Sequence, residues 1–328
     1  MNAADIPSLA ARLCAGERRA LARAITLAES TRADHRERAA ELLALLMPHT
    51  GRSIRIGISG VPGVGKSTFI EALGNHIIDA GHRVAALAVD PSSAISGGSI
   101  LGDKTRMEVL SRRPEAFIRP SPSGGTLGGV ARRTREAILL CEAGGFDVIL
   151  VETVGVGQSE TAVADMTDMF VLLLVPSGGD ELQGIKRGIV ELADFVIVNK
   201  ADGELLPIAQ RTAGEYANAL HLLRRRDDDW RVPVQTCSAI AGTGVAEAWN
   251  RMQEYCGRAR EAGRLASRRA NQARAWMWAD ATDALTAMLR SDAAASARVG
   301  TLEAEVTAGR LAPSVAAREL LELFLRRR

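Results

Sequence analysis

Cysteine pairs, long apolar runs and an excess of charge of either sign are all missing from this sequence. Its four cysteines, Cys14, Cys141, Cys237 and Cys256, are widely spaced and form no C-x-x-C pair, which favours reduced thiols in a cytosolic protein. The 41 Lys and Arg residues against 39 Asp and Glu residues leave a net charge of +2. This balance argues against nucleic acid or a membrane as the main partner.

A membrane-spanning helix is also excluded, because it needs ~20 consecutive apolar residues. The longest apolar run, MFVLLLV at 169–175, has the length of a strand. The first 25 residues carry acids as well as arginines and hold no continuous apolar segment, unlike a signal peptide. We therefore expect a cytoplasmic protein. With 328 residues, 47% of them hydrophobic, the chain can bury at least one large core.

Three regions follow one another along the chain. Residues 1–50 carry apolar residues at helical spacing, and the amphipathic segment HRERAAELLALLM stops at Pro48. Between residues 51 and 256, short apolar runs alternate with helical patterns: SIRIGIS, HRVAALAV, AFIRP, DVILVE, MFVLLLV, DFVIVN and VPVQTC. Several are apolar at nearly every residue, as expected of strands covered on both faces. The middle region is predicted to be an α/β domain with a mainly parallel sheet and helices on both faces.

The last region, residues 257–328, carries no strand signal. A long helical pattern over 257–290 contains Trp276 and Trp278, a break at SDAAASARVG follows, and a helical pair surrounds Pro313. Large apolar residues on a helix beyond the main core suggest an oligomer contact. We expect an N-terminal helical extension (1–50), a central domain (51–256) and a C-terminal helical arm (257–328).

The strongest motif is GVPGVGKST, which satisfies G-x-x-x-x-G-K-[ST] between a predicted strand and a predicted helix. Gly63 and Gly65 let the backbone curl so that successive N–H groups and the helix N-terminus point at phosphate. Lys66 is expected to reach the β and γ phosphates, and Ser67 to offer its hydroxyl to Mg²⁺. The predicted phosphate-binding residues are Gly60, Val61, Pro62, Gly63, Val64, Gly65, Lys66, Ser67 and Thr68, so the domain is a P-loop NTPase.

The base is predicted from VIVNKADG, where Asn199, Lys200 and Asp202 match N-K-x-D at the end of a strand. An Asp carboxylate accepts two N–H bonds from guanine that adenine cannot supply, and the unpaired carboxylate would penalise ATP. TCSAI, after the next strand, is either an ordinary turn or a loop whose backbone contacts guanine. The loop would supply Ser238, Ala239 and Ile240.

Carboxylates at two further strand ends are candidate metal ligands and catalytic groups. Asp90 ends HRVAALAVD, a long Gly/Ser loop runs from it to Asp103, and Glu152 ends DVILVE. Mg²⁺ takes oxygen ligands, so Ser67 with one or two of these carboxylates would supply what it needs. For Asp103, and less so for Asp90, a solvated loop is the alternative.

The residues after Glu152 predict slow hydrolysis. Many GTPases carry an Asp at this place, then a Gly, with a water-orienting Gln beside it. Here Gly155 is in register, but Val156 stands where the Gln would be and cannot orient water by hydrogen bonding. Gln158 is nearby and its direction is open. We therefore expect a slow basal GTPase rate.

A further loop, PSGGDELQGIKRG, follows the 169–175 strand. Carboxyl ends of parallel strands face the ligand crevice, so Asp180, Gln183 and Lys186 lie at the edge where they can sense nucleotide state or a partner. For Asp180, a helix-capping role is the alternative.

Taken together, GVPGVGKST, VETVGVGQ, DPSS…SGGSILGDKTRM, PSGGDELQGIKRGI and NKADG resemble the MeaB/ArgK-type GTPases. This group of metallochaperone GTPases is named for the Glu in Walker B, and close relatives assist methylmalonyl-CoA mutase, an adenosylcobalamin enzyme. The resemblance covers residues from about 54 to 245 densely. It implies a homodimeric GTPase chaperone, slow alone and stimulated by its partner. Such a protein would bind the mutase, gate cofactor loading, and help to protect or reactivate the mutase.

The resemblance also implies roles for individual residues. It assigns Lys66, Asp90, Asp103 and Glu152 to catalysis, with Ser67 and the three carboxylates on Mg²⁺, and Asn199 and Asp202 to guanine. Gly155 and Gln158, with the loop that contains Asp180, Gln183 and Lys186, are implied to be switch residues that respond to the client. The C-terminal helices resemble a dimerisation arm. No D-x-H-x-x-G motif occurs, so we expect cobalamin to be bound by the partner and not by this chain.

Three alternatives remain beside this interpretation. A nickel or zinc insertase would carry His-rich tracts or Cys pairs, whereas the five histidines here are dispersed. A targeting GTPase of the signal-recognition type would need a Met-rich module. An amino-acid transport-linked kinase would need a second-substrate pocket, which has no recognisable form in the sequence.

Overall fold

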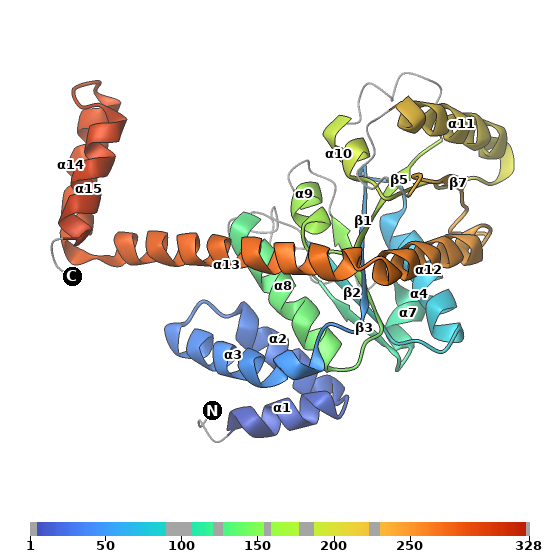
Figure 1. Ribbon diagram of the computed structural model, residues 1–328, viewed down its shortest axis with the longest axis horizontal. Helices are drawn as coiled ribbons and strands as arrows, with labels where there is room; N and C mark the ends of the chain where they lie inside the picture. Colours follow the sequence, from blue (N-terminus) through green and yellow to red (C-terminus); the bar gives the residue numbers. More distant parts are fainter. Residues whose placement is uncertain are drawn as a thin grey trace. The chain divides into compact units, whose positions relative to one another are not determined.

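A computed structural model gives the structure of residues 5–89, 107–120, 127–153, 159–176, 187–222 and 230–325 (Figure 1). The chain forms two compact units, Met1–Arg269 and Ala270–Arg328. The first holds a parallel sheet with its surrounding helices, and the second holds most of a long helix and a helix pair. Within the described ranges, no helix combines the length and the apolar character that a bilayer crossing requires.

The sheet of the first unit has seven strands in the described residues, in the order β3-β2-β4-β1-β5-β6-β7. Every neighbouring pair is parallel. The strands are β1 (Ile54–Gly60), β2 (Val84–Val89), β3 (Ala116–Arg119), β4 (Val148–Thr153), β5 (Met169–Leu174), β6 (Phe195–Val198) and β7 (Val234–Thr236). Because β1 lies between β4 and β5, the loop that follows β1 lies at the middle of the carboxyl edge. The predicted mainly parallel sheet is confirmed.

Helices cover both faces of this sheet, as the continuous apolar runs predicted. Leu173 of β5 belongs to an apolar core with α4 (Lys66–Asp79) and α12 (Val245–Glu261). Its neighbours Leu172 and Leu174 belong to a second core with α10 (Arg187–Leu192) and α11 (Leu206–Leu222). Successive side chains of a strand point to opposite faces, which is why β5 is buried along its whole length. The remaining helices between strands are α7 (Glu108–Arg112), α8 (Leu127–Ala143) and α9 (Ser159–Ala164), and a 3₁₀ turn, η4 (Gly203–Leu205), precedes α11.

Three helices precede the sheet, within the 1–50 region for which the spacing of apolar residues predicted helical structure. They are α1 (Ile6–Cys14), α2 (Arg18–Glu29) and α3 (Ala33–Leu46), and a 3₁₀ turn, η2 (Met47–His49), ends the segment at Pro48. Their apolar faces bury Leu13, Ile25 and Leu42. Helices α2 and α3 also pack against α8, so this segment is part of the first unit (Figure 1).

The amino-terminal edge of the sheet is held by buried ion pairs. Arg55 in β1 bonds to Glu142 of α8 with nitrogen–oxygen distances of 2.9 and 2.8 Å. Burial raises the pKa of Glu142, but the hydrogen bonds and charge of Arg55 outweigh it, so the pKa is lowered overall. Asp168, just before β5, accepts bonds from the backbone N–H of Arg55 (2.9 Å) and from Arg269 Nε (2.8 Å). This edge is therefore occupied by structural pairs, which leaves the opposite edge for ligands.

In the second unit, α14 (Ala293–Thr307) and α15 (Pro313–Leu325) form a helix pair. Asp292 caps α14 by accepting bonds from the backbone N–H groups of Ala294 (3.0 Å) and Ala295 (2.9 Å). The predicted break at SDAAASARVG is therefore wrong in extent, because only Asp292 of that stretch lies outside a helix. Eight of its ten residues are Ala, Val, Arg or Ser, which the helix accommodates once Asp292 caps it.

The helical pattern predicted over 257–290 is interrupted and not continuous. Helix α12 ends at Glu261, Gly263 adopts a left-handed conformation (φ +70°), and α13 (Arg264–Ser291) begins directly after it. A glycine in this conformation is a common helix end. Residue 257, the predicted start of the arm, lies within α12.

Candidate functional site

The loop between β1 and α4 holds the phosphate-binding motif. Gly65 precedes α4 in a left-handed conformation (φ +92°), and a Cβ there would lie 2.8 Å from Asn199 Nδ2. The position therefore requires glycine both for its backbone and for the close approach of a neighbour. Glycine supplies no capping side chain at the N-terminus of α4, and a helix N-terminus is a place where backbone amides bind anions.

Lys66 lies inside the curve of this loop. Its side chain is 7% exposed, and Nζ donates to the carbonyl oxygens of Gly60 (2.8 Å) and Val61 (3.2 Å). These bonds hold the ammonium group beside the α4 N-terminus, where a phosphate oxygen would be a stronger, charged acceptor. The loop can therefore bind phosphate through backbone amides and one fixed cation.

Ser67 and Glu152 lie side by side at the carboxyl edge. The Ser67 hydroxyl donates to Glu152 Oε1 at 3.1 Å. Glu152 is brought there by the pairing of β1 with β4, in which Ile58 is the partner of Glu152. A hydroxyl and a carboxylate oxygen are the hard donors that Mg²⁺ prefers, so this pair fits a magnesium site.

Asn199, at the end of β6, joins two loops. Its side chain is 2% exposed; Nδ2 donates to the carbonyl oxygen of Val64 (2.9 Å), and Oδ1 accepts from the backbone N–H of Ala239 (3.2 Å). Both ends of the amide are thus engaged by backbone. Asn199 fixes the phosphate loop relative to the TCSAI loop, a positioning role that the four-residue motif alone does not reveal.

Asp202 and Ser238 form the neighbouring pair. The Ser238 hydroxyl donates to the Asp202 carboxylate and accepts from the backbone N–H of Ala241 (3.1 Å). Asp202 itself is exposed, as is Ile240. The predicted base-reading residues therefore share one surface at the carboxyl ends of β6 and β7, although their contact with guanine remains a prediction.

Lys200 has an unusual backbone. Its φ of +59° is the only positive value at a non-glycine residue in the described part of the chain. Such a conformation is strained for a residue with a Cβ and recurs at functional sites. It produces a sharp turn between Asn199, directed at the phosphate loop, and Asp202, directed at Ser238.

Seven of the predicted site residues lie outside the described ranges. They are the metal candidates Asp90 and Asp103 and the switch candidates Gly155, Gln158, Asp180, Gln183 and Lys186. Within the residues described, no group of three or more His, Cys, Asp or Glu side chains is arranged to hold a metal ion. The roles of these seven residues stay predictions.

The family model described as "Methylmalonyl Co-A mutase-associated GTPase MeaB" matches residues 21–294. The chain belongs to this family. Its matched span includes the phosphate loop, Glu152, the N-K-x-D motif and the buried pairs at the amino edge. The resemblance in the motifs is thereby confirmed.

Individual relatives are similar over most of their length. A relative from Caulobacter vibrioides is 57% identical over 98% of both chains. The mouse "Methylmalonic aciduria type A homolog, mitochondrial" is 51% identical, covering 95% of this chain and 78% of the mouse protein. A solved structure, "Crystal structure of LAO/AO transport system kinase", has a TM-score of 0.79 and 38% identity, with 99% of each chain covered. The MeaB-family chain thus shares its fold with a solved P-loop protein.

The sequence alone did not predict the buried ion pairs that support the site in this family member. From the sequence, Glu142 is indistinguishable from an exposed polar residue of a helix. In the structure its side chain is 1% exposed and forms an ion pair with Arg55. Arg268 and Arg269, at the start of α13, bond to Asp194 and Asp168 in the first unit. An Asp directly before each of two apolar strands is the signal that could have indicated these pairs.

Proposed function

We propose that this protein is a GTP-binding and GTP-hydrolysing chaperone that associates with methylmalonyl-CoA mutase. In this role it gates adenosylcobalamin loading and helps to protect or reactivate the mutase. The observation that supports the proposal most is the family match over residues 21–294, which includes the whole nucleotide site. Cobalamin itself is bound by the mutase in this account.

The described residues supply the chemistry that nucleotide binding needs. Lys66 and the first amides of α4 bind the β and γ phosphates, because they combine a fixed cation with the positive end of a helix. Asn199 holds the phosphate loop in that shape. Asp202 accepts the two guanine N–H groups, and the Ser238 hydroxyl orients its carboxylate. Hydrolysis is slow in isolation because Val156 offers no hydrogen bond to water.

Mg²⁺ is the cofactor that this donor set fits. Ser67 and Glu152 would hold it, and Asp90 and Asp103 are the further carboxylates proposed for the cluster. When bound, Mg²⁺ would supply positive charge that stabilises negative charge on the phosphate oxygens. Glu152 also accepts a hydrogen bond from the Ser67 hydroxyl. This bond fixes the direction of the lone pairs on the serine oxygen.

The C-terminal arm is proposed to join two copies of the chain into a homodimer. Helix α13 exposes Met277, Trp278 and Leu285, with Trp278 63% exposed. Trp278 and Leu285 are seven residues apart and so lie on one face of the helix. Helix α15 exposes Val315 and Leu325 as well. In this scheme residues 1–50, 51–256 and 257–328 form the helical extension, the GTPase domain and the dimerisation arm.

Size-exclusion chromatography with purified methylmalonyl-CoA mutase tests the association. We expect a complex that depends on nucleotide, examined without nucleotide, with GDP and with a non-hydrolysable GTP analogue. Lys66→Ala serves as the matched control, because it should make the complex insensitive to nucleotide. A mutase that never elutes with the protein under any of the three conditions would contradict the proposal.

The solved relative titled as a transport system kinase gives one second candidate, a kinase that transfers the γ-phosphate to an acceptor other than water. Labelling GTP at the γ position separates the two. The GTPase proposal predicts that all label becomes inorganic phosphate, whereas a kinase leaves it on a protein or small molecule. A metal-insertion chaperone is the remaining alternative, and its nickel or zinc ligands would have to come from dispersed residues.

A further inference from the structure

A pair of buried hydroxyl groups joins the two strands that lead into the nucleotide site. Thr153, the last residue of β4, donates from its hydroxyl to Ser59 Oγ of β1 at 3.0 Å. Thr153 is 0% exposed and Ser59 is 1% exposed. Neither residue belongs to the phosphate loop, the metal candidates or the N-K-x-D motif, so none of the roles assigned to those groups explains the bond.

The bond continues the pairing of β1 with β4 by one step. The last pair in the register of the two strands is Ile58 with Glu152. Ser59 and Thr153 each follow that pair by one residue. Their side chains therefore link the strands at the carboxyl edge, where both strands end.

The hydroxyl pair lies on the face of the sheet opposite the Glu152 carboxylate. Leu150 belongs to the core with α4, so Glu152, two residues later, is on the α4 side of β4. Gly57 is on the other side of β1, because a Cβ there would lie 2.7 Å from Val163 of α9. Ser59, two residues after Gly57, shares that side. The hydroxyl bond thus fixes the strand ends from behind the carboxylate.

Each hydroxyl partner is next in sequence to a residue of the candidate site. Thr153 follows Glu152, the carboxylate that accepts the Ser67 hydroxyl at 3.1 Å. Ser59 precedes Gly60, the first residue of the phosphate loop. A hydrogen bond weakens steeply when its angle departs from the preferred one, whereas an apolar contact has no such direction. The bond therefore restricts how the carboxylate can move relative to the loop.

We propose that Ser59 and Thr153 are positioning residues for the Mg²⁺ site. Their bond keeps the end of β4 beside the end of β1, and so keeps the Glu152 carboxylate close to the Ser67 hydroxyl. The inference rests on the proposed function, since Mg²⁺ would be bound there together with the nucleotide. Without the bond, binding of the ion would also have to order the strand end, which lowers the affinity.

Isothermal titration calorimetry of the full chain with β,γ-imido-GTP, in Mg²⁺ and in EDTA, measures this effect without hydrolysis. The ratio of the two dissociation constants is the gain in affinity that Mg²⁺ provides. Residues that bond directly to metal ligands typically change metal affinity about 10–100-fold, and Thr153 acts through the backbone. We therefore expect Thr153→Val to lower the gain about three- to tenfold and to leave the affinity in EDTA within about twofold of the wild type. Thr153→Ser retains the hydroxyl and should restore the gain.

Ser59→Ala removes the other hydroxyl, and the double variant shows whether the two act as one unit. Each single variant should lower the Mg²⁺ gain by a similar factor, and the double variant by no more than either single one. Because Ser59 is on a different strand, Ser59→Ala decides the question if Thr153→Val fails to fold.

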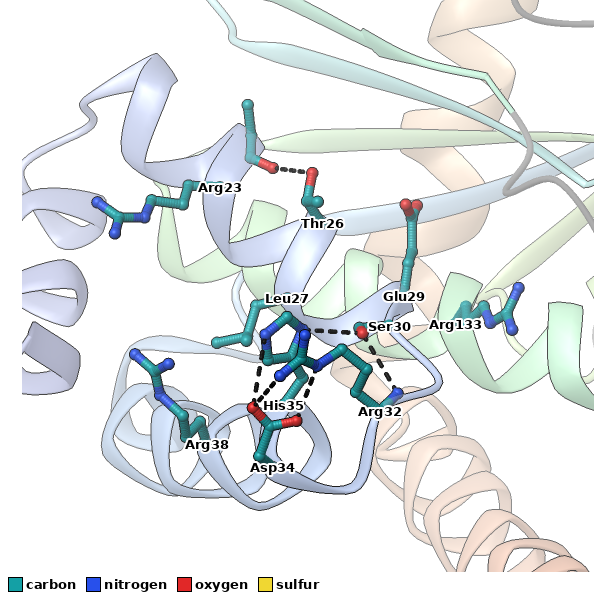
Figure 2. A pocket seen from close by; sticks show the side chains of 11 residues that line it. Arg23, Thr26, Leu27, Glu29, Ser30, Arg32, Asp34, His35, Arg38 and Arg133 are labelled. Carbon is teal, nitrogen blue, oxygen red and sulfur yellow. Dashed lines mark hydrogen bonds and ion pairs between the residues drawn. The ribbon is translucent and has the colours of Figure 1, made fainter. Parts of the chain in front are cut away.

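Two threonines that bond within a helix serve as matched controls. Thr134 is buried in α8 and donates to the carbonyl oxygen of Val130 at 3.0 Å. Thr26 is exposed in α2 and donates to the carbonyl oxygen of Ala22 at 2.9 Å (Figure 2). Thr134→Val and Thr26→Val should each leave the Mg²⁺ gain within about twofold of the wild type, because their bonds join no strands of the site.

The inference is wrong if Thr153→Val keeps the wild-type gain, because the hydroxyl pair would then contribute only to the fold. It is equally wrong if Thr134→Val lowers the gain as much, or if the effects of the two single variants multiply in the double variant. A wild-type chain that binds the analogue with no gain from Mg²⁺ contradicts it as well. A wild-type chain that binds no analogue in either condition would instead contradict the proposed function on which the inference rests.

Discussion

Replacing Asn199 with alanine tests how the two loops of the nucleotide site are held together. The change removes the bond from Nδ2 to the Val64 carbonyl oxygen (2.9 Å) and the bond from the Ala239 N–H to Oδ1 (3.2 Å). Each buried backbone group left without a partner costs about 1–3 kcal/mol. Since the second bond is long, we expect the free energy of unfolding to fall by about 2–4 kcal/mol.

Nucleotide affinity should fall as well, because the phosphate loop would have to be ordered by the ligand instead of by Asn199. A loss of about 1.4 kcal/mol of preorganisation corresponds to about tenfold in the dissociation constant. Urea denaturation gives the first quantity and calorimetric titration with GDP gives the second.

Asn75→Ala is the control for this experiment. Asn75 Nδ2 donates to the Glu71 carbonyl oxygen one turn earlier in α4. This bond lies within one helix and joins no loops, so the substitution removes only a local contact. Asn75→Ala should lower the free energy of unfolding by less than about 1 kcal/mol and leave the affinity for GDP unchanged. If Asn199→Ala behaves like Asn75→Ala in both assays, the positioning role assigned to Asn199 is refuted.

The remaining predictions concern phosphate, base and pH. Lys66→Ala should abolish tight nucleotide binding, and unchanged GTP affinity by titration would contradict the phosphate-loop assignment. Asp202→Asn should weaken GTP and favour xanthosine triphosphate, because the donor–acceptor pattern is inverted; a retained guanine preference in competition assays would count against base reading. The lowered pKa of Glu142 means that its pairing stabilises the fold above the ordinary glutamate pKa, about 4.3, and that this contribution disappears as pH falls through the lower folded pKa. Glu142→Gln leaves Arg55 buried without its charge partner, so it should cost about 3–5 kcal/mol at neutral pH and flatten the acid limb of a stability–pH curve; an unchanged acid limb would refute the coupling.

The strands could be predicted because each apolar run has a composition that only a buried parallel sheet explains. The runs around AFIRP and DFVIVN correspond to β3 (Ala116–Arg119) and β6 (Phe195–Val198). The strand order could not be predicted in the same way. Strand order depends on which strand each crossover connection places beside which other strand. The residues within a strand do not specify that neighbour.

The nucleotide motifs were predictable because their residues are consecutive, while the contacts that hold them are not. Asn199 bonds to Val64, which is 135 positions away in the sequence. Glu142 and Arg55 are 87 positions apart, on a helix and a strand that meet only in the folded unit. Local pattern identifies such residues as polar and gives no partner. The end of α12 was within reach of the sequence, since Gly263 is a recognisable helix terminator.

The central claim is that this MeaB-family protein is a GTPase whose rate depends on methylmalonyl-CoA mutase. The most direct test is the rate of phosphate release from GTP by the purified full chain, with and without stoichiometric mutase. Lys66→Ala with the same mutase gives the background from any contaminating activity. The account predicts slow release alone and strong stimulation by the mutase. A fast rate for the isolated protein, or a rate that the mutase leaves unchanged, would contradict it.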